Sequence, residues 1–374
     1  GVLTDFYDAE VKTMYTQEDY YWIWLCEQPG IGPAKRDALL KACGSVVSVY
    51  EAGIEQYVAA GVKEEQARQL ERSKDLEGVR KRCQEWANQG IFVITRAHTL
   101  FPEGLRNIYP SVGRLFGRGD KDLLSTSCLS IVGSRKCSSY GAGAARYLGK
   151  HLAKAGYTIV SGMASGIDAC AHQGALDARG KTIAILGCGI DICYPKGNLR
   201  LYEKIAHWGL ILSEYPPGTP PKAGLFPMRN RIIAALSRAI VIVEAAERSG
   251  ALITADQALD AGKEVFAVPG QIFSANSKGT HRLLRQGAML ISDWQDVPLE
   301  LGDLVQEEQE EKKTFQDADV QAIWEQISWE AQSIQQLSQK LGVEADKFMQ
   351  CITMLEMTGY VERRPDGSIL RKKQ

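Results

Sequence analysis

The chain has 374 residues, with 44 Lys and Arg against 45 Asp and Glu, and 45% of its residues are apolar. This size is sufficient for two or three globular domains, and the balance of charged and apolar residues excludes a disordered chain. The formal net charge of −1 also excludes a protein that is basic over its whole surface. A polyanionic partner therefore needs a local group of cations, because salt screens charges beyond about 10 Å.

Residues 1–89 predict a small helical domain. Within it, a turn at residues 29–33 contains Gly30 and Gly32 and precedes an apolar helical pattern that begins at Ala38. A Gly-Ile-Gly turn between two short helices resembles a helix-hairpin-helix, whose exposed amides hold one phosphate of a nucleic-acid backbone. A plain corner in a helical bundle fits the same residues, and the sequence leaves both alternatives open.

Residues 90–297 predict an α/β domain with an extended, Rossmann-like, doubly wound sheet. More than half of the 36 glycines lie between Gly133 and Gly287, where short apolar runs alternate with helical stretches. This alternation is typical of a parallel sheet whose two faces are covered by crossover helices. The predicted strands are Cys128–Val132, Thr158–Ser161, Thr182–Leu186, Leu210–Leu212, Ala239–Val243, Glu264–Val268 and Met289–Ile291. The predicted helices are Tyr140–Ala155, Ile167–Ala178, Asn198–His207, Arg229–Ser237, Ala251–Ala261 and Thr280–Gln286.

Two smaller regions follow the sheet domain. Residues 298–316 predict a solvated linker, because Glu307–Lys313 is almost entirely charged. Residues 317–374 predict a winged-helix-like domain, with helices at Ser333–Leu341 and Glu344–Met357 and a hairpin around residues 365–367. Between residues 316 and 362 there are eight acids and only two lysines, a balance that repels phosphates. We therefore expect a protein-contact or regulatory role there, although the basic end at residues 371–373 argues for nucleic acid.

The nine cysteines are scattered and never have the CxxC spacing. This pattern predicts reduced thiols in the cytoplasm, with neither a disulfide framework nor a metal site. Gly1–Asp8 lack the basic start and apolar core of a signal peptide. Apolar runs such as Ala239–Val243 are much shorter than the roughly 20 residues of a membrane span. We expect a cytoplasmic protein without a membrane span.

Two nucleotide-binding motifs fail on their spacing. Gly187 and Gly189 follow a strand, but Ile192 stands where the dinucleotide fingerprint needs a third glycine, which argues against NAD. The stretch from Gly174 to Thr182 resembles a Walker loop but has one residue too many and runs from a helix into a strand. A phosphate-binding loop must run from a strand into a helix, because only the helix N-terminus offers free amides. We therefore expect no cofactor.

Two other loops do run from a strand into a helix. Their glycines and hydroxyls would lie at the carboxyl edge of the sheet, where open α/β folds bind ligands. Tight turns without a ligand are the simpler alternative, but the neighbouring Arg135 favours contact with phosphates. The candidate phosphate-contacting residues are Gly133, Ser134, Ser161, Gly162, Ser165 and Gly166.

A third segment concentrates positive charge. Between Lys222 and Arg238 there are four basic residues and no acid, although the whole chain is nearly neutral. Phe226 lies among them, and a ring beside guanidinium groups can stack a base. The alternative is a core role for Phe226, with the arginines paired to Glu244 or Glu247.

Taken in order, these motifs make the chain resemble the DprA/Smf family over essentially its whole length. The motifs are GSR at 133–135, SGxAxGID at 161–168, GxGIDxxYP at 187–195, SEYPPG at 213–218, FPxRNRII at 226–233, RSGALITA at 248–255 and VPG at 268–270. The resemblance implies a cytoplasmic bacterial protein that binds single-stranded DNA, protects it during natural transformation and helps to load the RecA recombinase. It implies DNA-binding roles for Arg135, Lys196, Phe226, Arg229, Asn230, Arg231 and Lys263, and Tyr194 is expected to help Phe226 to stack bases.

The resemblance also implies a homodimer. The corresponding residues lie near the last helix and strand of the sheet domain, where apolar side chains could equally form ordinary core. The candidate interface residues are Ile272, Phe273, Leu283, Leu284 and Met289.

Two other functions fit the same sheet. One is a nucleotide-processing enzyme similar to the lysine-decarboxylase-like phosphoribohydrolases, although the loops at 216–221 and 248–256 lack their catalytic glutamate. In that case Asp168 and Glu214 would act as acid and base, whereas a structural role as a helix cap or an arginine partner is simpler. The other is a scaffold that binds only protein. We interpret the sequence as a non-enzymatic single-strand binder.

Overall fold

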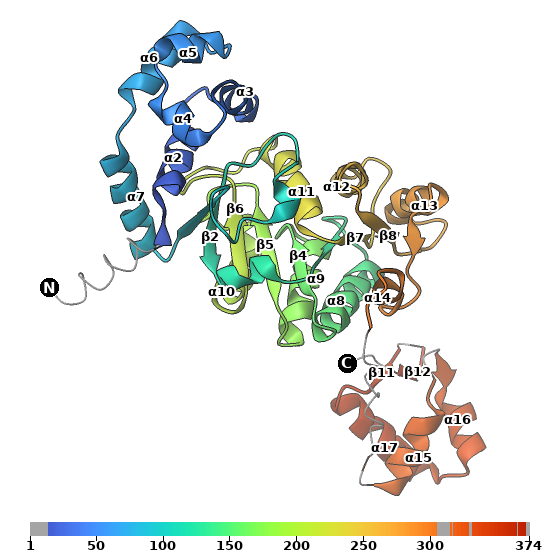
Figure 1. The fold of residues 1–374 in the computed structure, drawn as a ribbon. Coiled ribbons are helices and arrows are strands. Elements are labelled where there is room, and N and C mark those ends of the chain that lie inside the picture. The colour runs from blue at the N-terminus through green and yellow to red at the C-terminus, as the bar shows by residue number, and fades with distance from the viewer. Residues whose placement is uncertain (1–13, 305–314, 316, 329–330, 365, 372–374) are drawn as a thin grey trace, which may run out of the picture. The chain divides into compact units, whose positions relative to one another are not determined.

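The computed structural model describes residues 14–304, 315, 317–328, 331–364 and 366–371 (Figure 1). These residues divide into two compact units, with the boundary between residues 305 and 306. Within the described residues, no helix combines the length and the apolar character that crossing a bilayer requires.

The first unit is built on a nine-stranded sheet with the order β1-β2-β6-β5-β4-β3-β7-β8-β9. The seven strands β6, β5, β4, β3, β7, β8 and β9 are parallel to one another. Strand β2 pairs in antiparallel orientation with β6 and with the edge strand β1. The bounds are β1 Phe92–Thr95, β2 Arg114–Gly119, β3 Cys128–Val132, β4 Thr158–Ser161, β5 Thr182–Leu186, β6 Leu210–Ser213, β7 Ala239–Ile242, β8 Glu264–Ala267 and β9 Met289–Leu290.

Helices cover both faces of this sheet (Figure 1). Successive residues of a strand point to opposite faces, so that in β7 Ile240 packs into one core and Val241 into the other. The first face carries α8 Ser139–Lys154, α9 Ile167–Asp177, α10 Leu199–Trp208 and α14 Asp296–Glu300. The second carries α11 Leu225–Leu236, α12 Gly250–Asp260 and α13 Lys278–Arg285. The short 3-10 helices are η1 Glu103–Leu105, η2 Lys121–Ser125, η3 Lys196–Asn198 and η4 Ala275–Ser277.

The N-terminal helices share a core with this sheet. Trp24 and Leu39 lie in the same buried cluster as Phe116, Leu186 and Ile205. The predicted boundary at residue 89 therefore separates two regions of one compact unit. The helices are α2 Gln17–Cys26, α3 Pro33–Cys43, α4 Val46–Glu51, α5 Ile54–Ala59, α6 Glu64–Arg72 and α7 Leu76–Asn88.

The seven predicted strands are all present, and each end lies within one residue of its predicted position. Strands β1 and β2 were not predicted, because β1 has only four residues and β2 contains two glycines and two arginines. Helix α11 begins at Leu225, four residues before the predicted start. Its Pro227 lies in the first turn, where a helix tolerates proline because the amide has no intrahelical partner there.

The second unit has the winged-helix arrangement that was predicted. Its core contains Ile323, Phe348 and Ile352. Gly342 ends one helix in the left-handed conformation, with φ of 64°. The elements are α15 Ala318–Gln326, β10 Gln332–Ser333, α16 Ile334–Leu341, α17 Ala345–Met357, β11 Val361–Arg363 and β12 Ser368–Arg371, with the strand order β10-β12-β11. The charged stretch Glu307–Lys313 lies outside the described residues.

Candidate nucleic-acid interface

The loops that follow β3, β4 and β5 meet at the carboxyl edge of the sheet, because these strands are parallel neighbours. Ile167 N donates to Ser134 O at 3.2 Å, which joins the first two loops. Asn198 Nδ2 donates to Met163 O at 2.8 Å and joins the third to the second. Gly166 has φ of 79°, and a Cβ at this position would collide with Ser134 O. Glycine is required here for both reasons.

Aromatic rings and cations gather where these loops meet helix α11. The Arg135 guanidinium carbon lies 5.1 Å from the centre of the Phe226 ring, within cation–π range. The Tyr194 ring centre lies 5.5 Å from that of Phe226, with an interplanar angle of 31°. Phe226 packs against Gly187 at the end of β5, where a Cβ would collide with its ring. The sequence therefore places one ring at the junction of three loops.

Two exposed lysines lie close to these rings along the chain. Lys196 follows Tyr194 by two residues and is exposed, and Lys222 precedes Phe226 by four residues and is also exposed. Tyr194 is 43% exposed, whereas Phe226 is half-buried. We call Arg135, Tyr194, Lys196, Lys222 and Phe226 the ring–cation cluster. Lys222 was not among the predicted binding residues, although its acid-free segment was the signal that pointed to it.

The predicted phosphate-contacting loops are largely occupied by the protein's own contacts. Ser134 N donates to Glu244 O at 2.8 Å, and the buried Ser161 Oγ donates to Ile131 O at 2.6 Å. Gly162 is buried and its N donates to Asp168 Oδ2 at 3.1 Å. Of the six residues, Gly133, Ser134 and Gly166 are half-buried, and Ser165 is exposed. Phosphate contact by the Ser161 and Gly162 groups is therefore not compatible with this arrangement.

Asp168 is the internal partner of the Gly162 amide. Its carboxylate is buried and accepts from Gly162 N at 3.1 Å, and the backbone amides of Gly133 and Ala164 also favour its charged form. Burial raises the pKa of Asp168, and the nearby Arg229 and these amides oppose that shift. An internal carboxylate thus binds an amide of the loop before α9, in the region where a phosphate-binding loop would present free amides.

Arg229 is buried, contrary to the expectation that it contacts DNA. The residue is 4% exposed, and its guanidinium donates to the carbonyl oxygens of Gly162 and Ile185. Burial lowers the pKa of Arg229, but an arginine remains charged at neutral pH. Its role is to link the end of β4 to that of β5. Asn230 is half-buried, and its Oδ1 accepts from Arg229 Nε at 3.0 Å.

Arg231 is also buried and points away from solvent. Its Nη2 donates to both carboxylate oxygens of Glu214, at 2.9 and 2.8 Å, and its Nε donates to Pro110 O at 2.9 Å. Burial raises the pKa of Glu214, and Arg231 is the strongest opposing influence. The alternative in which the arginines form internal ion pairs is thus correct for Arg231, with Glu214 as its partner in place of Glu244 or Glu247.

Lys263 lies at the opposite edge of the sheet. It immediately precedes β8, which runs parallel to β7 and, through it, to β3. The start of β8 and the end of β3 therefore lie at opposite edges, and Lys263 is separated from Arg135 by the length of the strands. The expectation that it shares their rim is wrong for geometric reasons.

The five candidate dimer residues also divide by burial. Ile272 and Phe273 are 76% and 92% exposed. Leu283 is buried, while Leu284 and Met289 are half-buried and pack against the cores of their own unit. Only Ile272 and Phe273 are placed as free apolar side chains.

One buried histidine, His172, lies in helix α9 next to the start of β5. His172 Nδ1 lies 2.6 Å from Thr182 Oγ1, which itself donates to Ile159 O, so the Nδ1 carries the proton. His172 Nε2 is buried without a partner. Burial, together with the charge of Arg229, lowers the pKa of His172 to about 3.

The pH dependence of stability tests this environment. The unfolded chain binds a proton at His172 below about pH 6.5, and the folded protein does not until about pH 3. The free energy of unfolding therefore decreases as the pH falls through this window, by up to about 1.4 kcal/mol per pH unit from this group. Urea titrations at several pH values between 4 and 6 give the free energy of unfolding as a function of pH. This free energy should change less with pH in His172→Gln than in the parent chain. Parallel curves would contradict the burial of a neutral imidazole.

Comparison with known proteins bears on both units. The family model described as DNA recombination-mediator protein A matches residues 92–302, and that of the DprA winged helix domain matches residues 299–367. DNA processing protein DprA of Bacillus subtilis is 42% identical over 217 residues, which are 58% of this chain and 73% of that protein. The Streptococcus pneumoniae protein of the same name is 46% identical over 197 residues, which are 53% of this chain and 70% of that protein.

Solved structures of similar proteins agree with this match. The X-ray structure of DprA from Streptococcus pneumoniae has a TM-score of 0.68 at 36% identity and covers 75% of this chain and 97% of its own. A structure of DprA from Helicobacter pylori has a TM-score of 0.52 at 33% identity and covers 56% of this chain and 95% of its own. That structure concerns the single-stranded DNA binding mode of the Helicobacter protein.

Proposed function

Because the chain belongs to the DprA family of DNA recombination-mediator proteins, we propose that it binds single-stranded DNA at the ring–cation cluster. The observation that carries the proposal is the approach of Arg135 and Tyr194 to the same Phe226 ring. A base can stack on an aromatic ring regardless of its identity, while a neighbouring cation neutralises the adjoining phosphate. This combination favours unpaired strands, whose bases are free to stack.

Side chains carry the phosphate contacts in this proposal. The Gly162 amide already binds Asp168, the Ile167 amide binds Ser134 O, and both Arg229 and Arg231 are used inside the protein. Arg135, Lys196 and Lys222 remain as the exposed cations of the cluster. Three phosphate contacts correspond to a salt slope of roughly −2 for a single strand. Five contacts, as the sequence alone indicates, would give a slope between about −3 and −4.

The first prediction concerns these cations. Arg135→Ala and Lys196→Ala should each weaken binding of a labelled oligothymidine and reduce the magnitude of the salt slope by about 0.7, since each removes one phosphate contact. Lys263→Ala is the matched control, because it removes a lysine from the opposite edge of the same sheet. Fluorescence anisotropy at several salt concentrations measures both quantities. Equal losses for Lys263→Ala and Arg135→Ala would exclude the cluster as the binding site.

The proposed mode of action is non-enzymatic. Asp168 and Glu214, the two carboxylates that an acid–base mechanism would use, are both held by internal hydrogen bonds. The relatives are described as DNA-processing and recombination-mediator proteins, which supports binding without bond cleavage. Release of ribose phosphate from nucleoside monophosphates would instead favour the phosphoribohydrolase alternative.

The proposal extends to the cytoplasmic role of the family. The bound strand would be incoming DNA during natural transformation, protected by the protein and transferred to RecA. The family match and the single-stranded DNA binding of the Helicobacter relative support this role. Nuclease protection of the bound strand and faster assembly of RecA upon it are the corresponding measurements.

A homodimer through Ile272 and Phe273 forms part of the proposal. Two large apolar side chains this exposed are typical of an interaction surface. Pairing two molecules would place two clusters on one strand and increase the avidity.

Sedimentation tests this interface. Phe273→Ser should shift the chain from dimer to monomer at micromolar concentration without lowering its stability, because the ring is almost fully exposed. Leu283→Ala is the contrasting variant, since it creates a cavity in the core and should cost about 2–5 kcal/mol in unfolding free energy. An unchanged dimer in Phe273→Ser would show that the subunits pair elsewhere or through other residues.

A further inference from the structure

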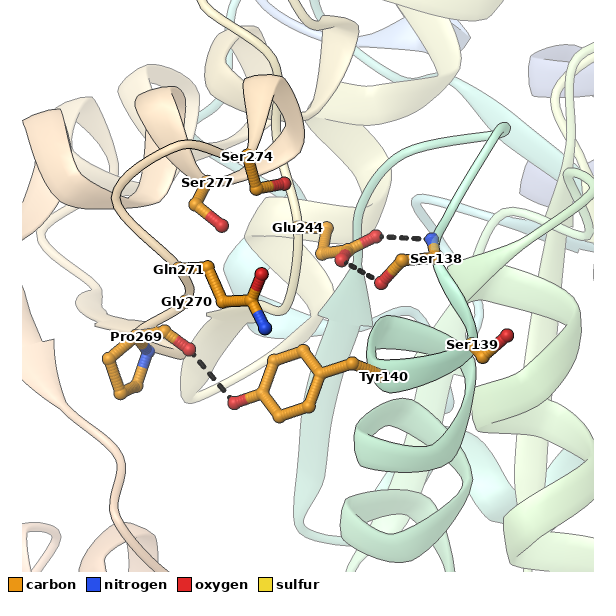
Figure 2. Close-up of a pocket in the computed structure, with 9 residues that line it drawn as sticks. All are labelled: Ser138, Ser139, Tyr140, Glu244, Pro269, Gly270, Gln271, Ser274 and Ser277. Atoms are coloured by element: carbon orange, nitrogen blue, oxygen red, sulfur yellow. Dashed lines mark hydrogen bonds between the residues drawn. The ribbon is translucent and has the colours of Figure 1, made fainter. Parts of the chain in front are cut away.

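A pocket of about 590 Å³ lies at the carboxyl edge of the sheet (Figure 2). Its volume falls within the range of small-molecule sites. It opens between the loop after β3, the end of β7 and the loop after β8. The lining residues are Ser138, Ser139, Tyr140, Glu244, Pro269, Gly270, Gln271, Ser274 and Ser277.

The position of the pocket follows from the topology of the sheet. Strand β3 lies between β4 and β7, so that the chain leaves β3 toward one side of the sheet and leaves β7 toward the other. The two connections diverge and leave a crevice at the carboxyl ends of β3 and β7. Open α/β sheets bind their ligands at such a switch point.

The charge of the pocket argues against phosphate. Its nine lining residues include one charged side chain, Glu244, and no cation. The Glu244 carboxylate accepts from Ser138 N at 2.9 Å and from Ser138 Oγ at 2.5 Å. It therefore already supplies the negative charge that the N-terminus of the 16-residue helix α8 attracts. A phosphate would be repelled by this carboxylate, whereas a neutral group with N–H or O–H donors would not.

One wall of the pocket is a fixed aromatic ring. Tyr140 is 55% exposed, and its hydroxyl donates to Pro269 O at 2.9 Å across the pocket (Figure 2). This hydrogen bond holds the ring between α8 and the loop after β8. In Figure 2 the Gln271 amide points into the space between Tyr140 and Glu244. The pocket thus combines a flat apolar surface with amide and hydroxyl groups that can hydrogen-bond a base edge or a sugar, while the buried Glu244 carboxylate is already paired with Ser138 and Asn276.

The pocket is also within reach of a strand bound at the cluster. Arg135 belongs to the cluster and Ser138 to the pocket, and three residues of extended chain span at most about 10 Å. Asn276 Nδ2 donates to Lys136 O at 2.9 Å, which fastens the β8 side of the pocket to the loop that carries Arg135. Cluster and pocket are therefore two parts of one edge with opposite character, one cationic and one without cations.

We propose that this pocket binds a nucleoside unit, with its base stacked on Tyr140 and its polar edge toward the exposed Gln271 amide. The unit is the base and sugar of a nucleotide, and its phosphate remains outside near Arg135. In the form where the unit belongs to a bound strand, the inference rests on the proposed function. A free nucleoside has the same chemistry and would occupy the same pocket.

The test compares Tyr140→Leu with Tyr140→Phe. Leucine removes the stacking surface, whereas phenylalanine keeps the ring and removes only the hydroxyl. The probe is a set of oligonucleotides, each with 2-aminopurine at one position. For at least one position, binding to the parent chain or to Tyr140→Phe should quench the 2-aminopurine fluorescence, and binding to Tyr140→Leu should not. Affinity should fall about 5- to 150-fold in Tyr140→Leu, as expected for the loss of one stacked base. Equal quenching and affinity in both variants would overturn the inference.

Further measurements distinguish a free nucleoside from a unit of a bound strand, and the pocket inference from the proposed function. Displacement of the 2-aminopurine signal by deoxyadenosine identifies a free nucleoside as a ligand, and resistance to displacement identifies the strand unit. If Arg135→Ala weakens binding while Tyr140→Leu does not, the pocket inference fails and the proposed function stands. If Arg135→Ala binds as well as the parent, the proposed function fails. Sedimentation of each variant shows whether dimerisation has changed, because Gln271 adjoins Ile272 and Phe273. Thermal unfolding confirms that each variant is folded.

Discussion

The carboxylate of Asp168 determines how the carboxyl edge of the sheet can bind a ligand. It accepts a hydrogen bond from Gly162 N at 3.1 Å, and the backbone amides of Gly133 and Ala164 also favour its charged form, so that it interacts with both strand-to-helix loops. In many doubly wound folds, amides in such loops bind a phosphate of a nucleotide. Here the anion is part of the chain, so that phosphates outside the protein must be bound by side chains. The ring–cation cluster provides such side chains at the rim of the same loops.

Burial decides which cations are available to a polyanion. The acid-free segment from residue 222 to residue 238 contains four cations, but their environments differ sharply. Arg229 and Arg231 are buried and donate hydrogen bonds to groups inside the protein. Arg238 forms an ion pair with Asp303 at 2.7 Å. Lys222 is the cation of this segment that lies in the cluster. Local charge in a sequence therefore indicates where to look for a binding surface and overestimates how many groups contribute to it.

The sequence predicts the sheet better than the site for a physical reason. A buried parallel strand needs an uninterrupted apolar run, and runs such as Cys128–Val132 are visible without any knowledge of contacts. Strand β2 is hidden because its arginines reach partners outside the strand, as Arg114 does with Glu27 and Ile23 O. In the site, Arg135 and Lys196 are exposed after strands, as their positions indicate. The burial of Arg229 and the position of Lys263 depend on three-dimensional neighbours that spacing does not encode.

For Glu244, the partner expected from the sequence differs from the partners found in the structure. The position of Glu244 near a group of bases in the sequence makes it a candidate partner for an arginine of α11. In the structure it accepts from Ser138 at the start of α8, while its backbone oxygen accepts from Ser134. Glu244 thus holds the loop that carries Arg135 and also supplies the acidic wall of the pocket at the switch point. In the proposed binding mode, the same residue separates the edge into a part that attracts phosphates and a part that excludes them, so that a strand lying across both parts would have its phosphates near Arg135 and a base in the pocket.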